Sequence, residues 1–176
     1  MKYVIYRIYY DMTDIKVNAK LLALVSVLLC LTSCSRPEHV DVLVVGGGAS
    51  GVSAGVQAAR MGVPTMIVEE TPWIGGMLTA AGVSCIDGNY KLQSGLFGEF
   101  ADSLARRYGS WEALQTGWVS YINFEPHVGQ EVLTAIADSC GDLLDVRRET
   151  VMESIRKDGE VWKVVLRASD GRRYVV

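Results

Sequence analysis

The hydrophobic residues after position 39 first form two continuous runs with a helical segment between them. The run at residues 40–45 (VDVLVV) is almost entirely aliphatic and β-branched, which predicts a buried parallel strand. Small residues in the segment 52–61 predict a helix that packs closely on a sheet, and Gly62 is expected to end it. The second run, at residues 64–69, completes a βαβ unit, whose crossover is almost always right-handed.

A long excursion follows at residues 70–124, where glycines are frequent at first and helical periodicity then appears. The predicted amphipathic helix of this excursion places five residues on one face: Phe97, Phe100, Ala101, Leu104 and Tyr108. Another helix is expected to begin at Pro126, because the first turn of a helix does not use the N–H that proline lacks. It should end near Gly141, before a short strand at residues 143–146.

The last part of the chain alternates between hydrophobic and polar residues, which is typical of half-buried strands. Strands are expected at residues 150–156, 161–168 and 172–176, joined by Asp-Gly pairs that favour tight turns. In the middle strand one face carries Trp162, Val164, Leu166 and Ala168. The pattern therefore predicts an α/β fold with a parallel sheet and an antiparallel β-meander.

The N-terminal segment has the features of an export signal. The apolar run at residues 21–31 is preceded by Lys16 and Lys20, and it is too short to span a bilayer, which needs roughly 20 apolar residues. The following Leu-Thr-Ser-Cys resembles a bacterial lipobox, so we expect a signal peptide at residues 1–33, a lipidated Cys34 and a tether at 34–40. A plain secretory cleavage site is the alternative.

These expectations place the protein in the bacterial cell envelope, exported and held at a membrane by its lipid. Met12 gives a more ordinary signal peptide than Met1, so we expect translation to begin there. The contexts of Cys85 and Cys140 differ, so buried free thiols are favoured over a disulfide. Removal of residues 1–33 takes away four basic and two acidic residues, and the acidic remainder argues against nucleic-acid binding. We expect no metal site.

The strongest functional motif is the Gly-Gly-Gly-Ala-Ser-Gly segment at residues 46–51, which matches GxGxxG. It follows a predicted strand, opens a predicted helix, and is followed at the end of the next strand by Glu69, as a dinucleotide requires. Gly46 would make the tight turn, Gly48 would let the backbone approach a pyrophosphate, and Gly51 would allow the helix to pack on the sheet. Glu69 would accept hydrogen bonds from the adenosine ribose. Glu70 should face the other way on the strand.

The glycine pattern continues to Gly55 and Gly62, and Gly75-Gly76-Met77-Leu78-Thr79 follows the acidic residue. In these features the chain resembles FAD-dependent oxidoreductases of the glutathione-reductase structural type. The resemblance covers residues 41–176 and implies a Rossmann-like FAD-binding domain. It places the pyrophosphate at Gly46, Gly48 and Gly51, with Ala49 and Ser50 in the same loop.

The resemblance also assigns the adenosine ribose to Glu69. It places Gly76, Met77 and Thr79 along the pyrophosphate and ribityl chain, and the backbone of Val151 at the adenine. Similar proteins continue beyond a meander of this kind with a further parallel strand and a substrate domain. We therefore expect residues 41–176 to be a partial FAD-binding domain, incomplete at the C-terminus and without its substrate domain.

The expected function is that of the FAD-binding part of an oxidoreductase acting on an unidentified small organic or glycan-derived substrate. An NAD-binding dehydrogenase is the first alternative, because GxGxxG followed by an acidic residue serves NAD equally well. A non-catalytic truncated remnant is the second. No residue in the sequence is assigned a catalytic role.

Overall fold

The computed structural model describes residues 38–87, 91 and 93–176. The predicted signal peptide, the lipidation residue Cys34 and both candidate start residues lie outside this part of the chain. Among the residues that are described, no helix combines the length and the apolar character needed to cross a membrane. Cys85 and Cys140 are both free thiols, as predicted, but each is half-buried rather than buried.

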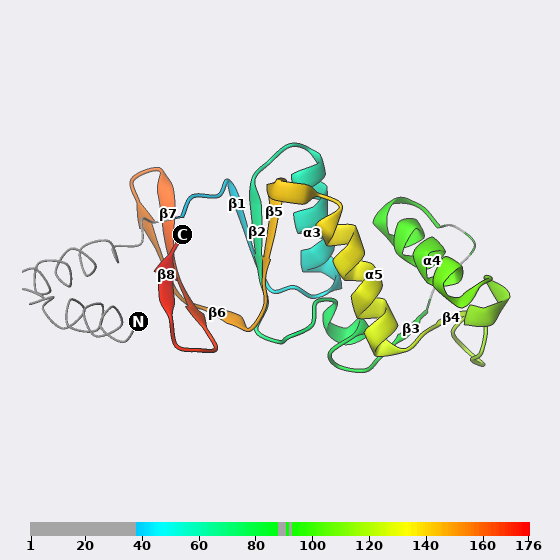
Figure 1. Cartoon of the computed structure of the whole chain (residues 1–176). Coiled ribbons are helices and arrows are strands. Elements are labelled where there is room, and N and C mark those ends of the chain that lie inside the picture. Colours follow the sequence, from blue (N-terminus) through cyan, green and yellow to red (C-terminus); the bar gives the residue numbers. More distant parts are fainter. Residues whose placement is uncertain (1–37, 88–90, 92) are drawn as a thin grey trace, which may run out of the picture. The chain divides into compact units, whose positions relative to one another are not determined.

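A three-stranded parallel sheet forms the middle layer, in the order β1-β2-β5 (Figure 1). The strands are β1 (Val42–Val45), β2 (Thr65–Val68) and β5 (Leu144–Arg147), and each pairs in register with its neighbour. All four residues of β2 are buried, because this strand has a neighbour on each side and a layer on each face. The two continuous hydrophobic runs therefore predicted the parallel strands β1 and β2, but β1 is only half-buried and Val45 is 52% exposed, because β1 pairs with a described strand on one side only.

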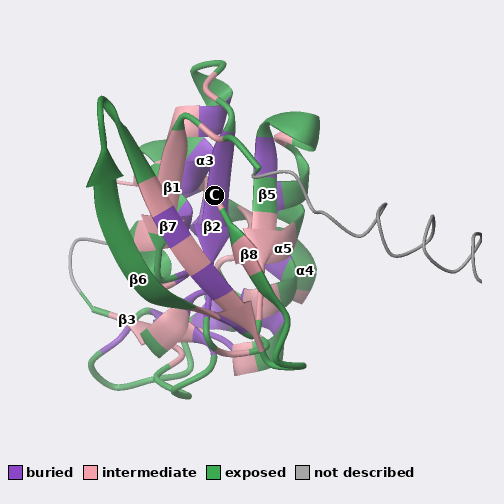
Figure 2. Ribbon diagram, turned by 90° about the vertical axis from the view of Figure 1, so that its left-hand side faces the viewer, coloured by how far each residue is buried: buried purple, intermediate pink, exposed green. Residues whose placement is uncertain are grey.

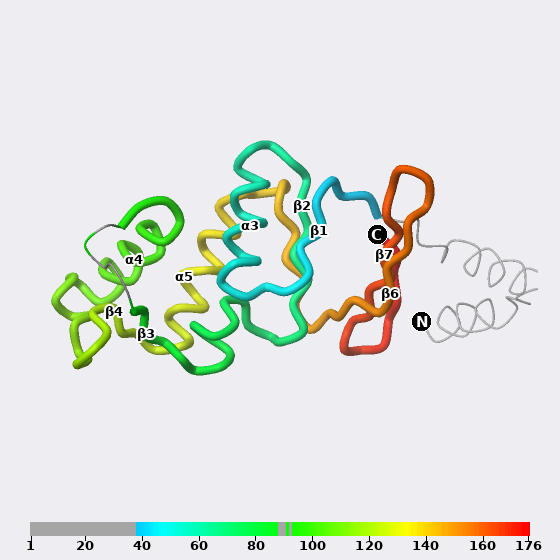
Figure 3. The backbone as a smooth tube through the Cα atoms, turned by 180° about the vertical axis from the view of Figure 1, so that it is seen from behind, coloured from blue at the N-terminus to red at the C-terminus, as the bar shows by residue number. Residues whose placement is uncertain are grey.

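Two helices cover one face of this sheet, and the views from the front and from behind agree on their position (Figures 1 and 3). They are α3 (Ala49–Arg60) and α5 (Pro126–Asp138). Helix α3 ends as predicted, with Gly62 in the left-handed conformation at a φ of 86°. It lies very close to the sheet at Gly55, where a Cβ atom would be only 2.5 Å from the side chain of Ile67.

The antiparallel meander covers the opposite face. It consists of β6 (Thr150–Asp158), β7 (Val161–Ala168) and β8 (Arg173–Val175). Figure 2 shows a buried stripe along β7 where it crosses the parallel sheet, while β6 is mostly exposed. The predicted alternation places Val164 and Leu166 in a core with Met66 and Val68, whereas Trp162 on the same face is 58% exposed.

The excursion between β2 and α5 is more structured than its sequence indicates. It contains η1 (Gly76–Leu78), β3 (Cys85–Ile86), α4 (Gly95–Tyr108), η2 (Glu112–Leu114) and β4 (Ile122–Asn123), and η3 (Gly141–Leu143) follows α5. Strands β3 and β4 form an antiparallel pair that was not predicted. The buried face of α4 includes Phe100 and Leu104 as expected, but Phe97 is 37% exposed.

Candidate functional site

The structure brings the two glycine motifs of the sequence together at the carboxyl end of the parallel sheet. The loop at residues 46–48 leaves β1 with the Gly46 N–H donating to the Val68 carbonyl at 2.8 Å. The Gly75 N–H donates to the Gly47 carbonyl at 2.7 Å, and Gly48 pairs with Gly75 in an isolated parallel bridge. The turn at Gly75-Gly76 therefore packs directly on the loop that precedes α3.

The N-terminus of α3 is free of any internal cap. Gly48 is the N-cap residue, the helix has no side-chain cap hydrogen bond, and no acidic residue lies in its first turn. The first N–H groups of a helix have no intrahelical partner, and with the helix dipole they favour an anion. A Cβ atom at Gly48 would meet nothing within 4 Å, and Ala49 and Ser50 are exposed. An anionic group can therefore approach this backbone closely.

The other two glycines of the motif are required by the backbone itself. Gly46 has a φ of 103°, a conformation that residues with a side chain rarely adopt. At Gly51 a Cβ atom would lie 1.8 Å from the carbonyl oxygen of Gly46. The sequence assigned Gly51 to packing of the helix on the sheet, but its tightest contact is with the loop, and Gly55 makes the close approach to the sheet.

Glu69 reaches this loop from the end of β2, and the residue is only 7% exposed. Its Oε2 accepts a hydrogen bond from the Gly47 N–H at 2.7 Å. Its Oε1 accepts from the N–H of Thr71 at 2.9 Å and from the Thr71 hydroxyl at 2.7 Å. Glu70 is exposed. Glu69 is thus the acidic side chain at the glycine loop, in the strand register that the sequence predicted.

The other residues predicted to contact the cofactor differ in how exposed they are and in what they contact. Gly76 approaches Gly48, where its Cβ would be 3.0 Å from the Gly48 Cα, and Met77 is 67% exposed. Thr79 is buried, and its hydroxyl donates to the Ile74 carbonyl at 2.7 Å, which fastens the turn. Val151 is half-buried on β6, next to the point where the Thr150 N–H donates to the Glu69 carbonyl.

Two contacts of the Glu69 side chain were not identified from the sequence. Gly47 occupies a position that GxGxxG leaves open, yet a Cβ there would lie 2.9 Å from the Glu69 Cβ. Thr71 holds the carboxylate through both its N–H and its hydroxyl. The extra glycine at this open position of the motif could have signalled the first contact. A threonine in a loop carries no comparable signal, because such residues are common in turns.

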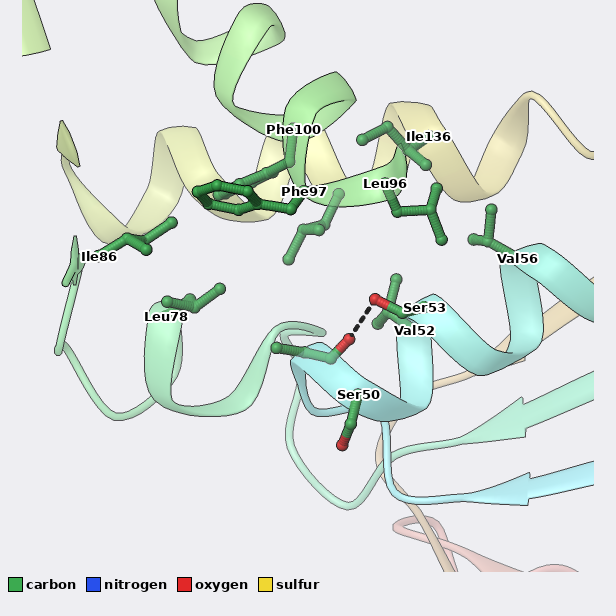
Figure 4. A pocket seen from close by; sticks show the side chains of 12 residues that line it. Ser50, Val52, Ser53, Val56, Leu78, Ile86, Leu96, Phe97, Phe100 and Ile136 are labelled. Carbon is green, nitrogen blue, oxygen red and sulfur yellow. Dashed lines mark hydrogen bonds between the residues drawn. The ribbon is translucent and has the colours of Figure 1, made fainter. Parts of the chain in front are cut away.

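An apolar pocket adjoins the same helix (Figure 4). It has a volume of about 260 Å³ and no charged residue in its lining. In Figure 4 the Ser53 hydroxyl donates to the Ala49 carbonyl, at 2.8 Å, so its hydrogen is already used. The side chains and backbone that line it come from α3, η1, β3, α4 and α5: Ala49, Ser50, Val52, Ser53, Val56, Leu78, Ile86, Leu96, Phe97, Phe100, Leu133 and Ile136.

Two proteins similar to this chain are a subunit of an oxidase and a dehydrogenase, each matched over a short segment. The chain is 46% identical over 50 residues to the sarcosine oxidase subunit alpha of Corynebacterium sp., covering 28% of this chain and 5% of that protein. It is 35% identical over 72 residues to the mitochondrial dihydrolipoyl dehydrogenase of Dictyostelium discoideum, covering 41% of this chain and 14% of the other. The chain therefore spans only a small part of these relatives.

Solved structures share the fold. A flavoprotein/dehydrogenase from Cytophaga hutchinsonii superposes with a TM-score of 0.56 at 17% identity, covering 78% of this chain and 37% of that one. The p-nitrophenol 4-monooxygenase of Pseudomonas putida superposes with a TM-score of 0.50 at 15% identity, covering 80% and 40%. These similarities confirm the predicted Rossmann-like fold with a parallel sheet and a meander.

The family comparison covers most of the chain. Residues 41–176 match the model of the family described as FAD dependent oxidoreductase, whose cofactor is the FAD that the sequence predicted. The chain belongs to the FAD dependent oxidoreductase family.

Proposed function

We propose that this chain forms the FAD-binding part of an oxidoreductase and holds the cofactor at the glycine loop. The pyrophosphate lies on the uncapped N-terminus of α3, against Gly48, Ala49 and Ser50. The adenosine ribose donates to Glu69, and the turn at Gly75-Gly76 lies beside the pyrophosphate. The observation that carries the proposal is the convergence of an open, uncapped helix N-terminus and the Glu69 carboxylate on one loop.

Bound FAD supplies the hydride chemistry, while the protein residues bind and orient it. The N–H groups at the start of α3 hold the negative charge of the pyrophosphate. Glu69 fixes the adenosine end and repels a 2′-phosphate, which favours FAD over ligands that carry one. The hydrogen bond from Gly75 to Gly47 joins the turn to the loop, so both would hold the pyrophosphate as one unit.

For the substrate we propose a small organic compound. The pocket beside α3 has no charged residue in its lining, and the hydrogen of the Ser53 hydroxyl is donated to the backbone. A glycan-derived substrate presents many hydroxyl groups, which such a lining would leave without partners. The pocket therefore favours the organic alternative, since apolar pockets with few polar groups are typical small-molecule sites.

The cofactor proposal predicts that the full chain binds FAD and not NAD. The expected result is a yellow protein that releases FAD on denaturation, with a calorimetric titration that detects FAD but not NAD. Gly75-Gly76 and the meander distinguish the chain from an NAD-binding dehydrogenase. Binding of NAD without binding of FAD would overturn the choice of cofactor, and a chain that binds neither would favour the non-catalytic remnant.

We also propose that the protein is an exported lipoprotein, held at a membrane through Cys34. One acyl chain binds a membrane only weakly, so stable anchoring requires the multiple chains that bacterial lipidation attaches. In bacteria that express the full chain, labelled fatty acid should be incorporated, and Cys34→Ala should abolish the label. Cys30→Ala, inside the apolar run, is the matched control and should retain it. Release of an unlabelled wild-type protein would indicate the plain secretory alternative.

A further inference from the structure

Thr71 stands between two acceptors in the predicted ribose site. Its Oγ1 lies 2.7 Å from the Glu69 Oε1 and also 2.7 Å from the carbonyl oxygen of Trp73. A threonine hydroxyl carries a single hydrogen, and neither a carboxylate nor a carbonyl can donate one. The hydroxyl can therefore form a full hydrogen bond with only one of the two acceptors at a time.

The carboxylate of Glu69 is nearly saturated before any ligand arrives. It offers about four acceptor positions. The N–H of Gly47, the N–H of Thr71 and the Thr71 hydroxyl already use three of them. An adenosine ribose brings two more donors, its 2′ and 3′ hydroxyls, so one of the donors has to leave.

Only the Thr71 hydroxyl is free to leave. The two N–H groups belong to backbone that is held by other contacts: the Gly47 carbonyl accepts from Gly75, and the Thr71 carbonyl accepts from Glu149 at 3.2 Å. The hydroxyl needs only to rotate its hydrogen from Glu69 towards the Trp73 carbonyl, which is already at hydrogen-bond distance. No heavy atom has to move.

We infer that Thr71 is a positioning residue whose hydroxyl donates to Glu69 in the empty site and transfers its hydrogen bond to Trp73 when the ribose binds. This inference rests on the proposed binding of FAD at the glycine loop. Trp73 immediately precedes the segment in which the Ile74 carbonyl holds Thr79 and the Gly75 N–H holds the loop. Ribose binding thereby strengthens the start of the turn that packs against the pyrophosphate site.

The exchange predicts an unusual sign for Thr71→Val, which keeps the shape and removes the hydroxyl. The empty protein loses a hydrogen bond to a charged acceptor, whereas the bound protein loses only one to a neutral carbonyl, and charge-assisted bonds are about twice as strong. The variant should therefore bind ADP, the adenosine and pyrophosphate portion of FAD, about three- to tenfold more tightly than the wild type. If the Thr71 hydroxyl instead kept its hydrogen bond to Glu69 in the bound protein, Thr71→Val would bind ADP more weakly than the wild type.

Calorimetric titration of ADP into the full chain tests this, with thermal unfolding of each empty protein as the check that it is folded. Thr71→Ser keeps the hydroxyl and should bind ADP as the wild type does. The matched ligand is 2′,3′-dideoxyadenosine diphosphate, which lacks both ribose donors, so Thr71→Val should not change its affinity.

The possible failures are distinguishable. If the wild type binds neither ADP nor FAD, the proposed function is wrong and the inference fails with it. If the wild type binds ADP but Thr71→Val binds it equally or more weakly, only the inference is overturned. A gain that Thr71→Ser shares, or that persists with the dideoxy ligand, would also overturn it, because the hydroxyl or the ribose would then not be responsible.

Discussion

Glu69→Gln should destabilise the empty protein as well as weaken nucleotide binding, although glutamine has nearly the same shape. Each oxygen of Glu69 accepts a backbone N–H, from Gly47 on one side and from Thr71 on the other. An amide has one oxygen and one NH₂ group, so one of these N–H groups would face another donor. A buried donor without a partner costs about 1–3 kcal/mol, which should appear in the free energy of unfolding measured by urea denaturation.

The effect of this substitution on binding has a separate cause. The ribose would lose a charged acceptor, and a charge-assisted hydrogen bond contributes about 1.5–3 kcal/mol, so the affinity for FAD or ADP should fall by roughly tenfold to a hundredfold. Glu69→Ala should be worse in both assays, because it leaves both N–H groups without an acceptor.

Glu70 provides the matched control for both measurements, since it has the same charge one position later and is exposed. Glu70→Gln should change the free energy of unfolding by no more than about 0.5 kcal/mol and should leave the nucleotide affinity unchanged. If Glu70→Gln weakens binding while Glu69→Gln does not, the assignment of the ribose acceptor to Glu69 is wrong.

The sequence was sufficient to predict the elements that carry the cofactor loop. Short continuous aliphatic runs bounded by turn signals are typical of strands in a parallel sheet, and the predicted runs at residues 40–45 and 64–69 contain β1 and β2. Glycine marks the points where the chain must turn, and Gly46 and Gly62 both have positive φ angles. Since strand side chains alternate, the same reasoning placed Glu69 rather than Glu70 at the loop.

What the sequence did not show depends on geometry over short distances. Strands of two residues, such as β3 and β4, have no periodicity to detect. The β-bulge between Met152 and Ser154 inserts one residue without any change in composition. The double contact of Thr71 with Glu69 and Trp73 arises from the exact path of a turn, and the sequence pattern around it contains no sign of that path.

Gly51→Ala should be one of the most damaging single substitutions in the domain, even though alanine in a helix is normally about 0.5–1 kcal/mol more favourable than glycine. The new Cβ would lie 1.8 Å from the Gly46 carbonyl oxygen. That oxygen belongs to the backbone, so it cannot rotate away as a side chain can, and the glycine loop must shift. Overpacking of this kind costs about 1–3 kcal/mol or more, measurable as a lower midpoint of thermal unfolding.

Gly48→Ala, three residues earlier, is the control for this substitution. It should leave the stability nearly unchanged but weaken the binding of ADP. Gly48 has a φ of −64°, which alanine adopts freely, and its Cβ would meet nothing within 4 Å. Stability should change by no more than about 1 kcal/mol, the scale of a helix-cap substitution. The methyl group would instead occupy the space through which the pyrophosphate approaches the helix, so ADP affinity should fall by more than about tenfold. If Gly48→Ala binds ADP as the wild type does, the pyrophosphate does not lie at Gly48. If Gly51→Ala unfolds at the wild-type temperature, Gly51 is not in close contact with the Gly46 carbonyl oxygen, and the predicted loss of stability is wrong.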